Sequence, residues 1–241
     1  MARRRLDELV VDRGLAADLR EAASLLMEGA ILVDGCPGAK PGTLVREDRV
    51  RLSARPGRKY VSRGGWKLEA ALDAFRVDPR GQVCADLGCS TGGFTDCLLQ
   101  RGALRVYAFD VGRGVMDWRL RQDPRVVLRE GFNVRYLSPA DIPEPLALVV
   151  ADLSFISLRL IFPVLVRFVS SQHILLVKPQ FEAGRREVEA GGLVTDPVVR
   201  GEILQRVKRA AVEHGLRILG EMESPLPGQK GNREYLLWTA P

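Results

Sequence analysis

The spacing of apolar and polar residues divides the chain into a short first part and a longer second part. Within residues 1–54, apolar residues fall at helical spacing twice, first around residues 6–10 and again around residues 18–28. Short apolar runs bounded by turn residues then predict strands at residues 30–33, 43–45 and 49–52. The pattern predicts a small α+β domain at residues 1–54.

From residue 62 onward, apolar runs alternate with amphipathic segments, and a helix is predicted over residues 66–75. Strands are predicted at residues 82–88, 104–111, 126–130, 146–152, 173–178, 216–222 and 234–239, with helices at 92–101, 158–169 and 197–214. Such alternation favours a mostly parallel sheet with helices on both faces. Residues 224–228 join the last two strands without a crossover helix, so the last strand should be antiparallel. We therefore predict an α/β fold with a seven-stranded, mostly parallel sheet, an arrangement that resembles the Rossmann-like class I methyltransferases.

Basic residues concentrate in the first quarter of the chain. The net charge is +6, and residues 1–63 hold thirteen Lys and Arg against nine Asp and Glu. Residues 49–67 hold seven basic residues and no acidic one, which suits a polyanion such as RNA. Residues 55–61 are predicted to be a basic linker to a second domain at 62–241, and a merely solvated linker is the alternative. The candidate RNA contacts are Arg4, Arg5, Arg20, Arg49, Arg51, Arg58, Lys59 and Arg63.

The composition argues against a metal site and a membrane span. The four cysteines form no C-x-x-C pair and the two histidines are far apart, so we expect no metal and no disulfide framework. The most apolar region, residues 146–169, is interrupted by Asp152, Arg159, Pro163 and Arg167. We expect a cytoplasmic protein with no membrane partner.

A glycine-rich loop follows the first strand of the second domain and opens a helix. Ligands of open α/β sheets bind at such a strand end, beside a helix N-terminus. The glycines lack the G-x-G-x-x-G spacing of dinucleotide sites, and Asp86 would repel two phosphates but suits the ammonium group of a methionine. This loop predicts S-adenosylmethionine as cofactor. Its candidate contacts are Asp86, Gly88, Cys89, Ser90, Thr91, Gly92, Gly93 and Phe94.

The next two strands end in further candidate contacts for the cofactor. Asp110 closes the second strand, with Val111 after it, at the separation where an acid accepts hydrogen bonds from ribose hydroxyls. Asn133 follows the third strand and has the donor and acceptor needed to read an adenine. A role for Asn133 as a turn or cap residue is equally compatible with the sequence.

Four charged residues stand out by their position. Lys67 lies on the helix predicted over residues 66–75, and three residues stand at strand ends around the expected active-site edge: Asp152, Lys178 and Glu234. Methylation of a ribose hydroxyl requires removal of a proton from a very weak acid, and a desolvated lysine beside a second lysine can accept one. We predict Lys178 as the general base and Lys67 as its modulator. Asp152, which also borders the predicted cofactor site, and Glu234 would orient the two ammonium groups.

The first 54 residues resemble the S4 domain, a small RNA-binding module. The resemblance rests on the order of elements and on Arg5-Leu6-Asp7, Arg20-Glu21, Gly29, Val33-Asp34-Gly35 and Pro41-Gly42. Two positions depart from the S4 pattern. Leu19 stands where the family usually has serine, which leaves Asp18 as the helix cap, and Cys36 stands where a basic residue often follows the turn.

Motifs along nearly the whole chain resemble the TlyA (haemolysin A) family. They are residues 62–68, 86–94, 110–112, 120–125, 133–135, 152–158, 178–182 and 231–234. That family joins an S4 domain to an FtsJ-like methyltransferase, and the resemblance implies 2′-O-methylation of cytidine in ribosomal RNA, within ribosomal subunits or ribosomes. The four charged residues match the lysine-aspartate-lysine-glutamate tetrad of FtsJ-like ribose methyltransferases. Tyr60 departs from relatives that have tryptophan there.

Three rival functions are to be weighed against ribose methylation. The first is methylation of an RNA base, either at an amino group or at cytosine C5. An amino-group base methyltransferase usually carries Asn/Asp-Pro-Pro-aromatic after the fourth strand, where this chain has Asp152-Leu153-Ser154-Phe155. A cytosine C5 methyltransferase needs a nucleophilic cysteine, and none occurs after Cys97. The other two rivals are a membrane-active haemolysin and an RNA-binding protein without activity.

Overall fold

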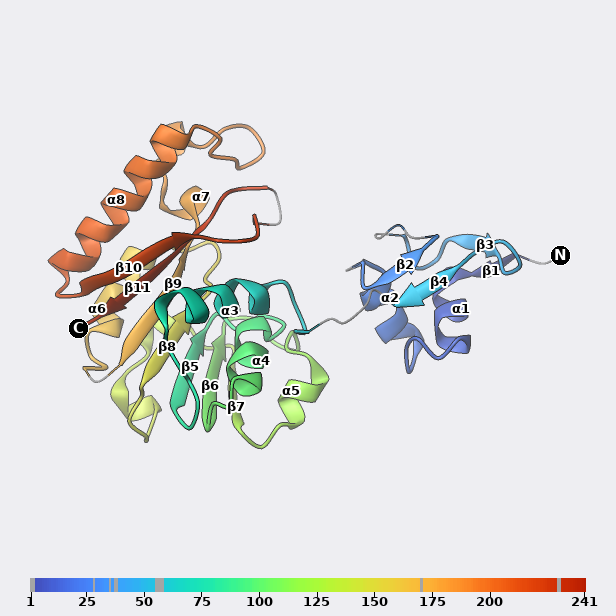
Figure 1. Cartoon of the computed structure of the whole chain (residues 1–241), viewed down its shortest axis with the longest axis horizontal. Helices are drawn as coiled ribbons and strands as arrows, with labels where there is room; N and C mark the ends of the chain where they lie inside the picture. The colour runs from blue at the N-terminus through green and yellow to red at the C-terminus, as the bar shows by residue number, and fades with distance from the viewer. Residues whose placement is uncertain are drawn as a thin grey trace. The chain divides into compact units, whose positions relative to one another are not determined.

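The chain forms two compact units, Met1–Lys59 and Tyr60–Pro241, in the computed structural model (Figure 1). The structure describes residues 3–27, 29–34, 36, 39–54, 59–169, 171–228 and 231–241. Each unit has a hydrophobic core of its own.

The smaller unit packs two helices against short strand pairs. Its elements are β1 (Arg3–Arg5), α1 (Leu6–Asp12), α2 (Leu19–Met27), β2 (Ile31–Val33), β3 (Leu44–Arg46) and β4 (Leu52–Ala54). Strands β1 and β3 pair antiparallel, as do β2 and β4. The core holds Leu6, Val10, Ala22, Leu26 and Ile31, because these residues recur on the inner faces of the helices and on β2. The predicted α+β organisation is present.

Three details of the smaller unit differ from the sequence-based expectation or refine it. The run Arg3–Arg5 is a strand, although it shows no apolar alternation, because pairing with β3 determines its conformation. The strand expected at residues 49–52 lies instead at Leu52–Ala54, after the turn at residues 47–49. Asp18 caps α2 as expected, since its Oδ1 accepts a hydrogen bond from Glu21 N at 2.8 Å.

The larger unit is built on one seven-stranded sheet. Its strands are β5 (Val83–Leu87), β6 (Arg105–Asp110), β7 (Val126–Glu130), β8 (Leu148–Ala151), β9 (Gln172–Val177), β10 (Arg217–Glu223) and β11 (Tyr235–Ala240). Their order across the sheet is β10-β11-β9-β8-β5-β6-β7, with β11 antiparallel to both of its neighbours. All seven predicted strands and the reversed last strand are confirmed.

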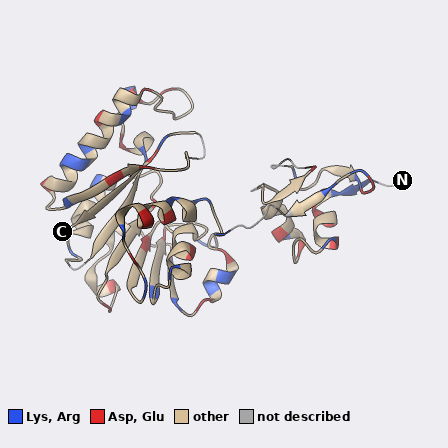
Figure 2. Cartoon of the chain, in the orientation of Figure 1, with Lys and Arg blue, Asp and Glu red and all other residues tan. Residues whose placement is uncertain are grey.

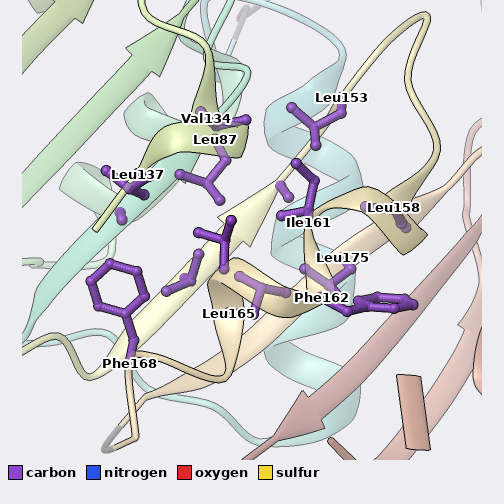
Figure 3. Close-up of a cluster of buried hydrophobic side chains, with 14 of the residues drawn as sticks. Leu87, Val134, Leu137, Leu153, Leu158, Ile161, Phe162, Leu165, Phe168 and Leu175 are labelled. Atoms are coloured by element: carbon purple, nitrogen blue, oxygen red, sulfur yellow. The ribbon is translucent and has the colours of Figure 1, made fainter. Parts of the chain in front are cut away.

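Helices cover both faces of this sheet, which is why its central strands are buried throughout. The helices are α3 (Gly64–Phe75), α4 (Gly93–Gln100), α5 (Trp118–Gln122), α6 (Phe162–Leu165), α7 (Pro179–Glu182) and α8 (Pro197–Glu213), with 3-10 turns η1 (Val134–Tyr136), η2 (Pro139–Asp141), η3 (Leu158–Leu160) and η4 (Arg185–Glu187). One core cluster packs α3, α4 and α5 against the sheet, and the other packs α6, α8 and η3 against its opposite face. Figure 3 shows part of the second cluster, around Phe162 and Leu165.

The helix predicted over residues 158–169 is wrong in its extent. The segment contains η3 and the single turn α6 instead. Pro163 has no N–H to donate and would clash with the carbonyl one turn back, so a continuous helix cannot pass through it.

The larger unit begins before residue 62. Tyr60 and Val61, which the sequence places in the linker, are buried in the core cluster of α3 and α4. Tyr60 fits there because residue 65 is glycine: a Cβ on Gly65 would lie 2.2 Å from Tyr60 Cγ. Val61 N also donates to Asp96 Oδ2 at 2.7 Å.

Candidate active site

The glycine loop after β5 has a backbone conformation that few residues other than glycine adopt. Gly88 has φ 82°, Ser90 has φ 47° and Gly92 has φ 96°. Gly92 also faces Leu120, whose Cδ1 would lie 2.3 Å from an added Cβ. Gly93 then opens α4 against Ser62, where an added Cβ would lie 2.1 Å from Ser62 Oγ. The predicted cofactor glycines thus form a tight loop before a helix N-terminus.

Asp86 is a fully buried carboxylate at the end of β5. Its Oδ2 accepts a hydrogen bond from Thr95 Oγ1 at 2.7 Å, while its Oδ1 has no hydrogen-bond partner among the described residues. Burial raises the pKa of Asp86 to about 7, and the negative charge of Asp152 adds to the rise. A buried carboxylate oxygen without a donor is a place for a cationic or hydrogen-bonding ligand group.

Asp110 lies at the end of β6 and holds the loop backbone. Its Oδ2 accepts from Ser90 N at 2.8 Å and its Oδ1 accepts from Gly112 N at 2.7 Å. Each carboxylate oxygen has a second lone pair, so the group can still accept from a ribose. Val111 beside it is exposed.

Asn133 caps the 3-10 turn η1, with its Oδ1 accepting from Arg135 N at 3.1 Å. The cap role, which the sequence left open beside adenine recognition, therefore uses one of the two lone pairs of its oxygen. The amide nitrogen remains capable of donating to a ligand.

The four charged candidates lie on neighbouring elements at one edge of the sheet (Figure 1). Asp152 follows β8 and Lys178 follows β9, which is parallel to it. Because β11 runs antiparallel to β9 with Tyr235 opposite Val177, Glu234 reaches the same edge as Lys178. Lys67 comes from α3, which covers the sheet. The glycine loop meets this edge, since a Cβ on Gly88 would lie 2.9 Å from the backbone oxygen of Asp152.

The four charges form two ion pairs. Lys67 Nζ lies 2.5 Å from Glu234 Oε2, and both side chains are buried. Lys178 Nζ lies 2.6 Å from Asp152 Oδ1 and donates a hydrogen bond to Ser154 Oγ at 2.8 Å. Each lysine thus has its own carboxylate partner.

Sequence reasoning missed four residues that the structure places at the site. Thr95 partners Asp86, and Ser154 partners Lys178. Phe155 is 92% exposed, has φ 64° and lies 5.3 Å from the ring of Phe181, centroid to centroid. Glu182 is a buried carboxylate that follows Lys178 by one helical turn. The motifs containing Ser154, Phe155 and Glu182 were visible, but nothing in the sequence shows which side chains meet.

The predicted RNA contacts are only partly available. Figure 2 shows basic and acidic positions interspersed over the smaller unit. Arg4 is paired with Asp12 and Glu47, and Arg5 with Asp7 at 2.6 Å. Arg20, Arg49, Arg51 and Lys59 are exposed. Arg63 is also exposed and donates to Pro227 O at 2.9 Å. Arg58 lies outside the described residues.

Among the residues that the structure describes, no helix combines the length and the apolarity needed to cross a membrane. Among the same residues, no cluster of three or more His, Cys, Asp and Glu side chains could hold a metal ion.

Comparison with known proteins identifies the family. The model of the FtsJ-like methyltransferase family matches residues 60–240. The 16S/23S rRNA (cytidine-2′-O)-methyltransferase TlyA of Mycobacterium tuberculosis is 48% identical over 99% of this chain and 90% of that protein. Hemolysin A of Brachyspira hyodysenteriae is 36% identical over 96% of this chain and 98% of that protein. A solved structure from Streptococcus thermophilus is 39% identical, with a TM-score of 0.77 over 99% of this chain and 88% of that one.

The sheet order, the glycine loop and these matches agree. The chain belongs to the FtsJ-like methyltransferase family and, within it, to the TlyA (haemolysin A) family.

Proposed function

We propose that the protein methylates the 2′-hydroxyl of a cytidine in ribosomal RNA, with S-adenosylmethionine as methyl donor. The observation that carries this proposal is the Lys178–Asp152 ion pair, whose aspartate lies against Gly88 of the glycine loop. The buried Lys67–Glu234 pair supports it, because Glu234 stands at the same end of the sheet as Lys178. The 48% identical relative named for this activity supports the choice of acceptor.

The residues at the ends of β5 and β6 suit the proposed cofactor. Asp86, with its partnerless buried oxygen, would hold the methionine ammonium, and the N-terminus of α4 would face the methionine carboxylate. Asp110 would accept hydrogen bonds from the ribose hydroxyls of the cofactor, and Val111 and Asn133 would lie against its adenine. When bound, S-adenosylmethionine supplies a methyl group on a positively charged sulfur.

Lys178 is the proposed general base. In the transfer, the 2′-oxygen forms a bond to the methyl carbon as the bond from that carbon to sulfur breaks, and the hydroxyl proton passes to Lys178 Nζ. Asp152 and Ser154 hold that nitrogen in place. Lys67, itself held by Glu234, would steer the 2′-oxygen.

RNA would be bound by two kinds of surface. The basic residues of the smaller unit, which resembles an S4 domain, would contact phosphates. Phe155, which is exposed and whose ring packs against that of Phe181, would stack on an unpaired base. The substrate would be ribosomal subunits or intact ribosomes.

A variant of Lys178 tests the proposal. Lys178→Ala should reduce methyl transfer from labelled S-adenosylmethionine to ribosomal subunits by about a hundredfold or more, because a positioned base contributes that much. Binding of S-adenosylmethionine, measured by calorimetry, should change little. Arg105→Ala, at the opposite end of β6 from the site, is the matched control. Methyl transfer by Lys178→Ala at the wild-type rate would show that Lys178 is not the general base.

A further inference from the structure

Two segments, a loop and a short helix with the residue before it, bring side chains to the active-site edge. The first covers residues 152–157 and lies between β8 and η3. Its ends are anchored by Leu153 and Leu158, which both point into the hydrophobic cluster of Figure 3. Between these anchors, Ser154 and Phe155 are exposed. The second segment is Lys178 with the short helix α7, which ends at Glu182.

The first loop holds a strained residue. Phe155 has φ 64°, a left-handed conformation that is unfavourable for a bulky side chain without special support. Such strain persists only where the surrounding structure enforces it. On one side of Phe155, Ser154 accepts a hydrogen bond from Lys178. The support on the other side comes from Glu182.

Glu182 joins the two segments through both of its carboxylate oxygens. Ser157 Oγ donates to Oε2 at 2.6 Å, and Leu158 N donates to Oε1 at 2.7 Å. The Nε of Arg159 lies 3.6 Å from Oε2, which adds a charge interaction. The side chain is buried, where hydrogen bonds to a charged acceptor are strong and their loss leaves unpaired groups.

We propose that Glu182 is a positioning residue for the acceptor side of the site, an inference that rests on the proposed function. Its carboxylate locks the loop carrying Asp152, Ser154 and Phe155 to the helix that follows Lys178. It thereby sets where Lys178 and Phe155 meet the incoming ribose and base. Among the described residues, no hydrogen bond or ion pair joins Glu182 to the glycine loop after β5.

Substitution of Glu182 should therefore affect the kinetic constants for RNA but not the affinity for S-adenosylmethionine. Loss of the Glu182 bonds should disturb acceptor geometry, which lowers kcat and raises KM for RNA. Affinity for S-adenosylmethionine should stay within about twofold of wild type, because the glycine loop is untouched.

Glu182→Ala, Glu182→Gln and Glu187→Ala form the test set, assayed with labelled S-adenosylmethionine and ribosomal subunits. We expect Glu182→Ala to lose at least tenfold in kcat/KM for RNA. Glu182→Gln should recover most of it, because its oxygen can accept from Leu158 N while its amide donates to Ser157 Oγ. Glu187 is the matched control: it also accepts from a backbone N–H, that of Gly184, and pairs with an arginine, Arg206, but does not touch the first loop.

Thermal unfolding and cofactor affinity are measured on every variant. The inference is overturned if Glu182→Ala loses no more kcat/KM than Glu187→Ala, or if it loses cofactor affinity in the same proportion as activity. If Glu182→Ala does not fold, Ser157→Ala removes one of the two bonds. It should lower kcat/KM at least threefold with unchanged cofactor affinity, and wild-type values would overturn the inference. Failure of the wild-type protein to methylate ribose would instead sink the proposed function itself.

Discussion

Asp86 illustrates how a single residue carries an electrostatic cost that a ligand can relieve. It is fully buried, only one of its oxygens has a partner, and its pKa is raised to about 7 by burial. A proton is therefore bound more tightly in the folded chain than in the unfolded chain, where an aspartate pKa lies near 3.8. Stability contributed by this proton is present at low pH and is lost as pH rises toward and through about 7.

The variant Asp86→Asn removes this ionisation while keeping the shape. We expect its free energy of unfolding, relative to wild type, to improve by about 2 kcal/mol between pH 5.5 and pH 8, because only wild type must carry the buried charge. Affinity for S-adenosylmethionine should fall at the same time. Urea unfolding at both pH values measures the first effect, and a difference between the two proteins that does not change with pH would contradict it.

The positions of Asp86, Asp110, Asp152 and Lys178 could be predicted from the sequence because each closes an apolar strand, and strand ends define the binding edge of such sheets. Their partners could not be predicted. Thr95 is simply the third residue of α4 in the sequence, and its bond to Asp86 depends on how helix and strand pack. For Arg4, the pattern indicated RNA contact, and the structure shows acidic partners around it.

At the scale of elements, β9 and β11 enclose a neutral histidine. His173 is fully buried, with Ser171 Oγ 2.9 Å from its Nε2 and Thr239 Oγ1 3.1 Å from its Nδ1. Burial lowers the pKa of His173 to about 4. The unfolded chain then binds the extra proton between about pH 6.5 and pH 4, so stability is lost as pH falls through that window.

We expect the free energy of unfolding of the wild-type protein to fall by about 2 kcal/mol between pH 7 and pH 5 because of His173 alone. His173→Asn should be less stable than wild type at pH 7 yet lose less on acidification. Urea unfolding of both proteins at the two pH values tests this. Equal losses in the two proteins would show that His173 is not the source.

Packing between the entry segment and α3 gives a second element-scale prediction. Gly65→Ala would place a Cβ 2.2 Å from Tyr60 Cγ, and Tyr60 is too buried to move aside. We expect a destabilisation of about 1–3 kcal/mol from overpacking. Gly201→Ala in α8 is the control: nothing lies near its added Cβ, so about 0.5–1 kcal/mol of stabilisation is expected. Equal unfolding free energies for the two variants would contradict the tight fit.

The same contact explains what the sequence could not show about element boundaries. Tyr60 and Val61 follow a basic, Pro- and Gly-containing stretch and so look like linker, but burial depends on the space that Gly65 leaves. Strands of the large sheet were predicted well because apolar runs buried on two faces are distinctive. The three-residue strands of the smaller unit were placed less well, since pairing rather than local pattern determines them.

At the scale of the whole molecule, the proposed function requires the basic smaller unit and the catalytic unit to bind the same RNA. Arg20 and Arg49 are exposed, so replacing both by alanine should weaken binding to ribosomal RNA. The slope of log K against log salt should become shallower by about 1–2, because fewer phosphates release counterions. Arg105→Ala, whose guanidinium pairs with Glu144, should leave the slope unchanged. Identical slopes for the double variant and wild type would exclude these two arginines from the RNA surface.

Under the proposed function, a ribose 2′-oxygen receives the methyl group. A 2′-O-methyl group removes the hydroxyl that attacks the neighbouring phosphate in alkali, so it protects that one linkage from hydrolysis. After incubation of ribosomal subunits with labelled S-adenosylmethionine and the protein, alkaline digestion should leave the label in dinucleotides whose 5′ member is 2′-O-methylcytidine. Label released in single nucleotides, with the methyl group on a base, would contradict the proposed 2′-O-methylation.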